Sequence, residues 1–292
     1  MRALFVGNLT IDVLDNRVRV GGSGFYGGVA LSEYLGVETY VLSSASEKYG
    51  PLFRSVLSTY GIKLLEVKCH SVATFRISGR KMWILDSGCC IPKSSIDTSI
   101  SVVRPDILLL TPVFKELAIS DSLEVLSSFN GVKAVDLQGF VRERLDSRLA
   151  CVWREQLKDV VMNSTVVHGN IKEFCIGADA ADVMRWLRDY SKRCSALILA
   201  SLDEKGCYAA YRGRVYLVPA PPTSAIDDVG AGDILTAVAA YYLAQGVTPL
   251  EAACRGVAAA SLKVENPYSA WFDRESIDTV SKSLLHLIKE IV

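Results

Sequence analysis

The sequence lacks an excess of either charge. Its 32 lysines and arginines balance its 32 aspartates and glutamates, and histidine occurs only three times among 292 residues. Proteins that bind nucleic acids or anionic membrane surfaces usually carry a clear positive excess. The composition therefore argues against both kinds of partner.

Long apolar runs are also missing, although half of the residues are hydrophobic. No stretch approaches the roughly 20 consecutive apolar residues that cross a bilayer. The apolar run at the N-terminus is too short for a signal peptide, and repeats, low-complexity segments and long linkers are absent. We therefore expect a cytoplasmic protein with one large domain and a sizeable core.

The eight cysteines show no metal-binding pattern. None belongs to a Cys-x-x-Cys pair or has zinc-site spacing, and several lie among apolar residues. We expect buried, reduced thiols that pack as small hydrophobic side chains. Disulfides are the alternative if the source is a hyperthermophile.

What the sequence does contain is a regular alternation of apolar strand-like runs and amphipathic helical segments. Strands are predicted at 3–6, 38–43, 107–110, 133–136, 161–168 and 196–200, and helices at 28–35, 51–60, 120–127, 181–194 and 250–264. Continuous apolar strands separated by helices predict an α/β fold with a doubly wound, mostly parallel sheet covered on both faces.

Two shorter segments, 13–20 and 74–85, interrupt this order. Their alternation of apolar and polar residues predicts short β-strands that extend from the main sheet. They would either cover a ligand or form a peripheral hairpin. Apolar residues such as Phe75 and Trp83 would cover the substrate or form a dimer seam, so either a monomer or a homodimer is expected.

The most informative motif is Ile226-Asp227-Asp228-Val229-Gly230-Ala231-Gly232-Asp233, which an apolar helical segment follows directly. N–H groups in the first turn of a helix lack intrahelical acceptors and attract anions. Gly230, Ala231 and Gly232 are small enough for a phosphate to approach this backbone. A carboxylate beside a phosphate needs a task, so Asp233 is predicted to accept a proton from an attacking hydroxyl. The alternative is a glycine-rich turn with an aspartate cap.

Other polar residues follow apolar strands. Asp12 lies near the carboxyl end of the first strand, where α/β proteins bind ligands, and its carboxylate suits a polyol unless it only caps a turn. Asn170 and Glu173 are three positions apart, so both side chains can face one site. Their oxygens suit magnesium held mostly through water, and they also fit a capping box. His168 has no visible partner in the sequence and is interpreted as structural.

A glycine-rich segment, 21–28, formally contains a G-x-G-x-x-G pattern. It does not follow the first strand of a βαβ unit, and no acidic residue that could hold a ribose ends the next strand. We therefore do not expect a dinucleotide site.

These motifs together resemble those of the ribokinase-like (PfkB) carbohydrate kinase family. The late D-T-x-G-A-G-D signature of that family matches residues 227–233 at six of seven positions, with Asp228 in place of Thr. The resemblance implies that Asp233 is the catalytic base and that Gly230, Ala231 and Gly232 form the anion hole. It further implies that Asp227 helps to hold a monovalent cation, K⁺, behind that hole.

The resemblance also implies a single kinase domain, 1–292, with a β lid formed by about 13–20 and 74–85, ATP as co-substrate and Mg²⁺ as cofactor. Residues 21–26 are similar to the family's G-G-x-G-x-N substrate loop, with Tyr26 in place of Asn, and 201–206 to its T-x-G-x-x-G nucleotide loop, with Asp203 in place of the middle Gly. The implied substrate contacts are Asp12, Gly22, Ser23, Tyr26, Gln138 and Arg142. The implied nucleotide contacts are Asn170, Ser201, Gly206 and Gly232, with Asn170 and Glu173 near magnesium.

Three features are similar to the archaeal and plant inositol kinases of this family: the Phe25-Tyr26 pair and the segments 111–116 and 135–142. We therefore predict transfer of the γ-phosphoryl group of ATP to a hydroxyl of a polyol or sugar, with myo-inositol as the first candidate. Two alternatives remain open: a nucleoside or ribose-type sugar kinase of the same family, and a non-catalytic regulatory protein that binds sugar or nucleotide on the same scaffold.

Overall fold

The computed structural model describes residues 1–14, 17–78, 81–145, 148–176, 180–268 and 270–291. Ten strands form the main sheet in the order β16-β15-β14-β13-β12-β9-β8-β1-β4-β5, and pairing is parallel from β13 to β5. The strands are β1 (Arg2–Val6), β4 (Glu38–Ala45), β5 (Lys63–Lys68), β8 (Ile107–Leu110), β9 (Val132–Asp136), β12 (Val166–Asn170), β13 (Leu197–Ser201), β14 (Cys207–Tyr211), β15 (Arg214–Val218) and β16 (Lys289–Glu290). The predicted α/β class with a mostly parallel sheet is confirmed.

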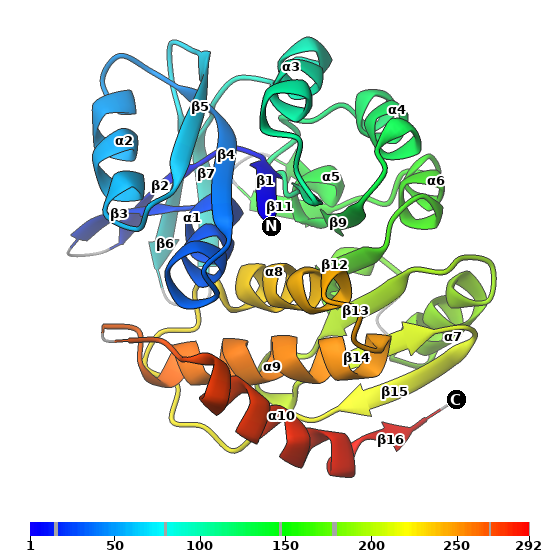
Figure 1. Cartoon of the computed structure of the whole chain (residues 1–292). Coiled ribbons are helices and arrows are strands. Elements are labelled where there is room, and N and C mark those ends of the chain that lie inside the picture. Colours follow the sequence, from blue (N-terminus) through cyan, green and yellow to red (C-terminus); the bar gives the residue numbers. More distant parts are fainter. Residues whose placement is uncertain (15–16, 79–80, 146–147, 177–179, 269, 292) are drawn as a thin grey trace.

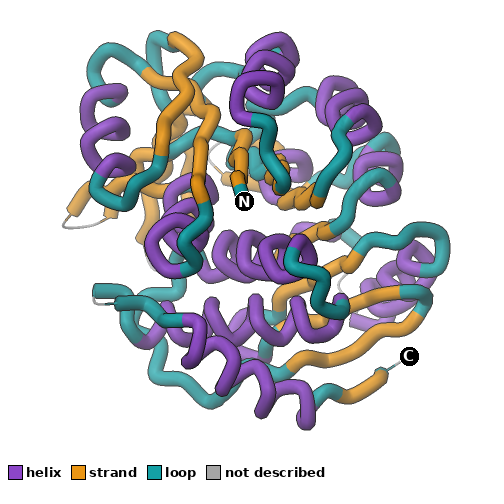
Figure 2. The backbone as a smooth tube through the Cα atoms, in the orientation of Figure 1, coloured by secondary structure: helices purple, strands orange, loops and turns teal. Residues whose placement is uncertain are grey.

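Helices cover both faces of this sheet, as the ribbon and tube views show (Figures 1 and 2). They are α1 (Ser23–Val29), continued by the π-helical turn η1 (Ala30–Tyr34), α2 (Gly50–Ser58), α3 (Lys93–Val103), α4 (Ile119–Ser128), α5 (Gln138–Val141), α6 (Leu157–Met162), α7 (Ala180–Ser191), α8 (Ala231–Ala244), α9 (Pro249–Glu265) and α10 (Arg274–Leu287), with 3₁₀ turns η2 (Ile171–Phe174) and η3 (Asp203–Lys205). None of the described helices is long and apolar enough to cross a bilayer.

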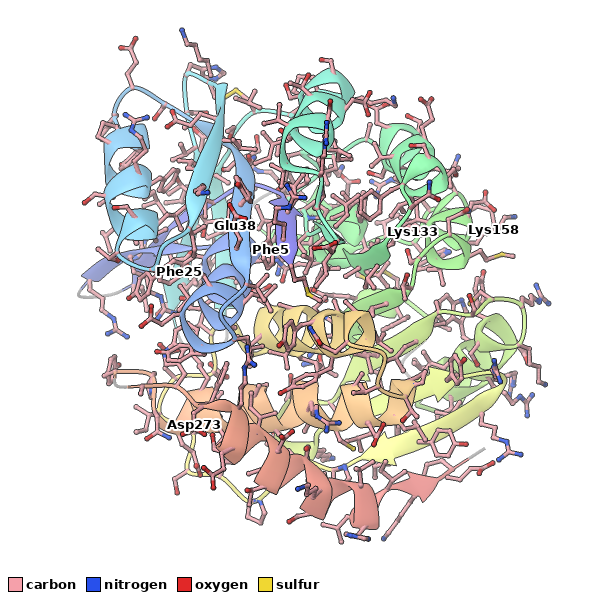
Figure 3. All side chains as sticks on the ribbon, viewed as in Figure 1. Phe5, Phe25, Glu38, Lys133, Lys158 and Asp273 are labelled. Carbon is pink, nitrogen blue, oxygen red and sulfur yellow. A yellow bond between two sulfur atoms is a disulfide. The ribbon has the colours of Figure 1, made fainter. Side chains whose placement is uncertain are left out.

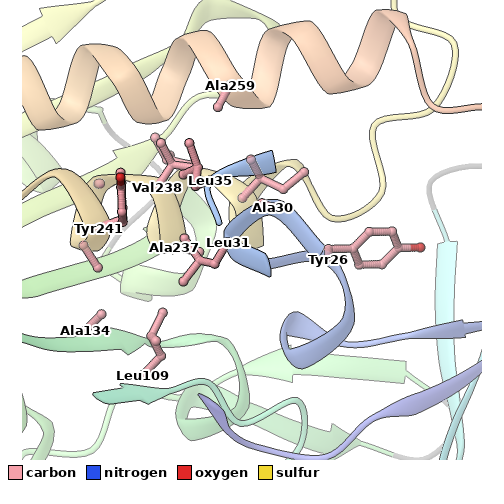
Figure 4. Close-up of a cluster of buried hydrophobic side chains, with 14 of the residues drawn as sticks. Tyr26, Ala30, Leu31, Leu35, Leu109, Ala134, Ala237, Val238, Tyr241 and Ala259 are labelled. Carbon is pink, nitrogen blue, oxygen red and sulfur yellow. The ribbon is translucent and has the colours of Figure 1, made fainter. Parts of the chain in front are cut away.

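Alternate residues of the parallel strands enter two separate cores. Phe5 of β1 belongs to the apolar cluster that contains α1, α8 and α9, part of which is shown in Figure 4. Its neighbour Leu4 belongs to the cluster that contains α3, α4, α6 and α7. Strands that are apolar on both faces therefore appear in the sequence as continuous hydrophobic runs. Figure 3 shows the contrast between Phe5 within the fold and Lys158 at its periphery.

Two predicted boundaries are wrong. The strand expected at 161–168 begins only at Val166, because Val160 and Val161 are buried in α6. The helix expected at 28–35 begins earlier, at Ser23, so much of the predicted glycine-rich loop is the first turns of α1. Short apolar runs do not distinguish a buried helix from a buried strand.

A second sheet of four strands has the order β3-β2-β6-β7, with β2 (Thr10–Leu14), β3 (Arg17–Gly21), β6 (Ala73–Ser78) and β7 (Lys81–Ser87). It comes from the two regions predicted to form a lid, and residues 15–16 and 79–80 of these regions lie outside the described residues. Phe75 is buried and packs near Val113 of the main body, while Trp83 is half-buried. A covering role for this sheet stays a prediction.

Disulfides link four cysteines, contrary to the expectation that all eight are reduced thiols. Cys69 pairs with Cys89, and Cys151 pairs with Cys175. The first bond joins the segments that follow β5 and β7, which are distant in sequence but adjacent in space. Because sequence spacing does not report such adjacency, the pairing could not be derived from the sequence alone. The expectation of a buried free thiol holds for Cys207 and Cys254.

Candidate active site

The polar residues gather where the parallel strands end. Asp136 at the end of β9 lies opposite His168 of β12, and Asn170 of β12 lies opposite Ser201 of β13. Helix α8 begins nearby and packs against β9 and β12. Sequence reasoning therefore found segments that the fold places on one edge of the sheet.

Helix α8 starts at the predicted anion-binding motif. Gly230 precedes it with φ 82°, a left-handed conformation that favours glycine. A Cβ atom there would also lie 2.2 Å from the Tyr26 ring, so the ring occupies the space that a side chain would need. The N–H of Ala231 donates to the Asp228 carbonyl at 3.2 Å, which leaves Gly232 and Asp233 as the stronger candidates for anion donors. The Asp228 side chain is exposed.

Asp233 lies in the first turn of α8, and its side chain is half-buried. Burial raises the pKa of its carboxyl to about 7, and the negative charge of Asp136 acts in the same direction. A hydrogen bond from Ser23 and the positive charges of His168 and Arg142 oppose this shift. A carboxyl with a pKa near 7 changes protonation at neutral pH, as a general base must.

Ser23 contacts this carboxylate directly. Its Oγ donates a short hydrogen bond to Asp233 Oδ1. Gly22, the residue before it, accepts the N–H groups of Phe25 at 2.9 Å and of Tyr26 at 3.2 Å and so begins helix α1. In this structure Ser23 and Gly22, predicted as substrate contacts, bind the Asp233 carboxylate and the first turn of α1, respectively.

His168 has a partner that the sequence did not reveal. Its Nδ1 lies 2.7 Å from Asp136 Oδ2 and its Nε2 lies 3.3 Å from Ser201 Oγ. Burial disfavours the imidazolium, but the Asp136 carboxylate outweighs this and raises the pKa of His168. A Cβ at Gly232 would lie 2.8 Å from the imidazole, so His168 contacts the anion-binding turn from beneath. The sequence offered one signal for this pair, because the predicted strands 133–136 and 161–168 each end in a titratable residue, Asp136 and His168.

On the side of the second sheet lie three polar side chains, those of Asp12, Arg19 and Tyr26. Asp12 is 5% exposed and accepts a hydrogen bond from Thr10 at 2.8 Å, and burial raises its pKa. Arg19 of β3, a residue that sequence reasoning missed, contacts Asp227 at 2.6 Å and lies 4.0 Å from Asp12. Among the described residues, the Nε and Nη2 atoms of Arg19 and the hydroxyl of Tyr26 are buried without a hydrogen-bond partner. Buried polar atoms without partners are costly, which points to a ligand that completes them.

Arg142 and Gln138 lie near the same edge. Arg142 Nη1 donates to the Val113 carbonyl at 3.2 Å, and Nη2 lies 3.8 Å from Glu173. Its guanidinium carbon is 5.8 Å from the centre of the Phe75 ring in the second sheet. Arg142 therefore connects this sheet to the β12 segment. Gln138 begins α5, and its backbone N–H donates to Asp136 at 2.8 Å.

The residues predicted to bind nucleotide and magnesium lie at the ends of β12 and β13. Asn170 and Glu173 form the capping box that was the alternative interpretation, with the Glu173 carboxylate accepting the Asn170 N–H at 2.8 Å. The Asn170 amide donates to Asp203 at 2.8 Å, and Lys172 lies 3.8 Å from the same carboxylate. Gly206, with φ 100°, ends the turn that contains Asp203. Asn170, Lys172 and Asp203 are more exposed than Asp12 and Tyr26, and they already contact one another.

The amide and carboxylate oxygens of Asn170 and Glu173 are hard donors, which fits a magnesium ion held mostly through water. When bound, such an ion would neutralise charge on a transferred phosphoryl group.

One family model and several solved structures are similar to this chain. Residues 133–271 match the model of the pfkB family of carbohydrate kinases. This part of the chain, just under half of its length, is similar to that family. It contains the β9, β12 and β13 ends and the whole anion-binding motif. No curated protein sequence matches the chain significantly.

Solved structures of the ribokinase type match nearly the whole chain. A pyrophosphate-dependent kinase in the ribokinase family, complexed with a pyrophosphate analog and myo-inositol, is 18% identical with a TM-score of 0.78 and covers 95% of this chain and 100% of its own. Ribokinase from Thermotoga maritima is 20% identical with a TM-score of 0.74, covering 96% and 99%. Phosphofructokinase-2 from Escherichia coli in complex with fructose-6-phosphate is 15% identical with a TM-score of 0.69, covering 98% and 99%. At these identities the likeness shows the ribokinase-like fold.

Proposed function

We propose that this chain is a small-molecule kinase of the pfkB type that transfers a phosphoryl group to a hydroxyl of a polyol or sugar. The observation that carries the proposal is the half-buried Asp233 carboxyl in the first turn of α8, which accepts a hydrogen bond from Ser23 and has its pKa raised to about 7 by desolvation. A base with this pKa beside backbone anion donors suits a hydroxyl that attacks phosphorus.

In this mechanism the acceptor hydroxyl replaces the Ser23 hydroxyl on Asp233. Its proton passes to the carboxylate as the new oxygen–phosphorus bond forms and the bond to the leaving phosphate breaks. The N–H groups of Gly232 and Asp233 stabilise the charge on the transferred group, with His168 holding that turn from beneath. Asp12, Arg19 and Tyr26 bind the remaining hydroxyls of the acceptor.

The acceptor we propose is myo-inositol or a similar polyol. A ring with several hydroxyls would satisfy the unpaired Arg19 and Tyr26 atoms and the Asp12 carboxylate at once. The aromatic Tyr26 supports this choice over a nucleoside or ribose, and the neighbour complexed with myo-inositol agrees with it.

ATP is the donor that the family resemblance implies, and pyrophosphate is a second candidate. Asp203 places a carboxylate in the segment that resembles the nucleotide loop and already binds the Asn170 amide. An anionic side chain there disfavours a nucleotide phosphate nearby. One structural neighbour is described as a pyrophosphate-dependent kinase, which adds weight to this candidate.

The test is a turnover panel with magnesium. Acceptors are myo-inositol, ribose, fructose, adenosine and cytidine, each combined with ATP, ADP or pyrophosphate, and Asp233→Asn is the inactive control. Turnover with myo-inositol that disappears in the control is expected. Turnover only with a pentose or nucleoside would overturn the acceptor assignment. Ligand binding without turnover across the panel would instead favour a regulatory protein.

A further inference from the structure

Lys263 is a fully buried lysine on α9, with 1% of its surface exposed. Its Nζ donates to the Asp227 carbonyl at 3.0 Å and, by a shorter bond, to the Val229 carbonyl. The ammonium also lies 5.3 Å from the centre of the Tyr26 ring and 6.0 Å from that of Trp271. Two carbonyl oxygens thus accept hydrogen bonds from the ammonium and two aromatic rings lie near it, contacts that favour a buried cation.

The segment that Lys263 binds leads directly into the anion-binding turn. The next residue after Val229 is Gly230, which precedes helix α8. The N–H groups of Ile226 and Asp227 donate to the Val264 carbonyl at 2.8 and 3.3 Å, so the end of α9 holds this segment through both side chain and backbone.

The hydrogen bond from Lys263 to the Val229 carbonyl also affects the N–H group that follows it. The Val229 carbonyl and the Gly230 N–H belong to one planar peptide group and point in opposite directions. When Lys263 binds the carbonyl from behind, it therefore fixes the direction of the N–H at the start of α8. A misplaced donor in this turn would weaken its hold on a phosphoryl group.

The family resemblance implied a monovalent cation in this place, held with the help of Asp227. The residues present do not fit an added cation. The Asp227 carboxylate accepts the Arg19 guanidinium at 2.6 Å and the Val229 N–H at 3.1 Å, and two backbone carbonyls of the segment face the Lys263 ammonium. A second positive charge beside this ammonium would be repelled with little water to screen it.

We propose that the Lys263 ammonium takes the place of a monovalent cation behind the anion hole, so that the protein needs no added K⁺. Lys263 is a positioning residue, since it acts through the 227–230 backbone and not on the substrate. The effect on turnover rests on the proposed kinase function, whereas the effect of K⁺ on stability does not.

The first test uses the unaltered protein. Turnover and thermal unfolding are measured while K⁺ replaces tetramethylammonium at constant ionic strength. We expect both to be independent of K⁺. A protein that is activated by K⁺, or whose unfolding temperature rises specifically with K⁺, would overturn the proposal without any variant.

The second test compares Lys263→Ala with Lys263→Met. Alanine opens space beside the carbonyls, whereas methionine fills much of that space without charge. We expect both to lose about 10²-fold in turnover, the scale of a small misplacement in a catalytic site. K⁺, NH₄⁺ or ethylammonium should restore turnover and raise the unfolding temperature of the alanine variant, with little effect on the methionine variant.

Lys282→Ala, at an exposed position on α10, is the control for loss of a lysine. A Lys263→Ala variant that keeps full turnover, or that responds to these cations no more than the unaltered protein, would contradict the proposal. If the variants do not fold, the unaltered protein still decides the question. If the chain has no kinase activity, the proposed function fails, and the unfolding measurements with K⁺ still test the cation.

Discussion

The two halves of the candidate site differ in how completely their polar groups are satisfied. On the proposed acceptor side, the buried Nε and Nη2 atoms of Arg19 and the Tyr26 hydroxyl have no hydrogen-bond partner in the described structure. On the donor side, Asn170, Asp203 and Lys172 are more exposed and bind one another. Buried unpaired groups discriminate strongly between ligands, whereas exposed paired groups contribute little. We infer that the acceptor is selected more stringently than the donor.

Asp233→Asn removes the proposed base, on which both halves of the candidate site depend, and has the largest expected effect. Loss of the base should lower kcat about 10²–10⁴-fold while binding of donor and acceptor remains. The matched control is Asp228→Asn, an exposed carboxylate in the same motif, which should keep its turnover. A D233N variant with normal kcat would remove Asp233 from the base role.

The same variant should be more stable than the unaltered protein above neutral pH. Because the folded-state pKa of about 7 lies above the ordinary value of 3.8, the unfolded chain loses its proton first as pH rises. Folding stability therefore falls between these two values, and Asp233→Asn removes that loss. The unfolding temperatures of the variant and the unaltered protein should be equal near pH 3.8 and differ most above pH about 7. A constant difference at all pH values would contradict this origin.

Tyr26→Phe tests the acceptor side alone. It removes a hydroxyl that has no hydrogen-bond partner among the described residues, so stability should not fall. The KM for the acceptor should rise about tenfold, the value of one lost hydrogen bond, while the KM for the donor is unchanged. Tyr241→Phe, at a buried tyrosine towards the other end of α8, is the control. An equal rise in the KM for acceptor and donor would contradict a role of Tyr26 in acceptor binding alone.

His168→Gln addresses the residue beneath the anion-binding turn. Because the Asp233 carboxyl must be ionised, kcat/KM should rise with pH through about 7. The positive charge of His168 lowers the pKa of Asp233, so its removal should move this limb to higher pH, by up to about one unit. Ser201→Ala removes a neighbour of the imidazole but leaves its charge and should not move the limb. A shift in the opposite direction would contradict the assigned electrostatic role.

Asp203→Gly has the smallest expected effect and concerns the donor side. It releases the Asn170 amide and removes a negative charge from the segment that resembles the nucleotide loop. The KM for ATP should fall about two- to fivefold, the range for an exposed ion pair, with no change in the KM for the acceptor. Glu204→Gly adds the same backbone freedom in η3 and serves as the control. If ATP binding is unchanged while pyrophosphate binding improves, pyrophosphate becomes the better-supported donor.

The fold could be predicted because its strands are apolar on both faces. Segments such as 107–110 are buried throughout and lie between helices, so composition alone indicates a parallel sheet. The hairpin formed by β10 (Arg142–Leu145) and β11 (Arg148–Cys151) was missed, because its short polar strands carry no such pattern.

The candidate site was predictable only where its residues are close in sequence. Residues 226–233 contain both the proposed anion-binding turn and the proposed base, and the structure places them together at the start of α8 because they are neighbours in sequence. Arg19 meets Asp227, and Lys263 meets Val229, only after folding. A sequence pattern reports residue types and spacing, but not which distant side chains the topology brings together.

The hydrogen bond from Ser23 to Asp233 also matters when no substrate is bound. The chain presents an alcohol of its own to the base, in the place that an incoming hydroxyl would occupy. An acceptor that enters exchanges one hydrogen bond for another, so this step changes the energy of the carboxylate little. Water must make the same exchange but lacks the other hydroxyls that Asp12, Arg19 and Tyr26 would bind. Under the proposed function, this exchange at Ser23 would favour a polyol over water at Asp233.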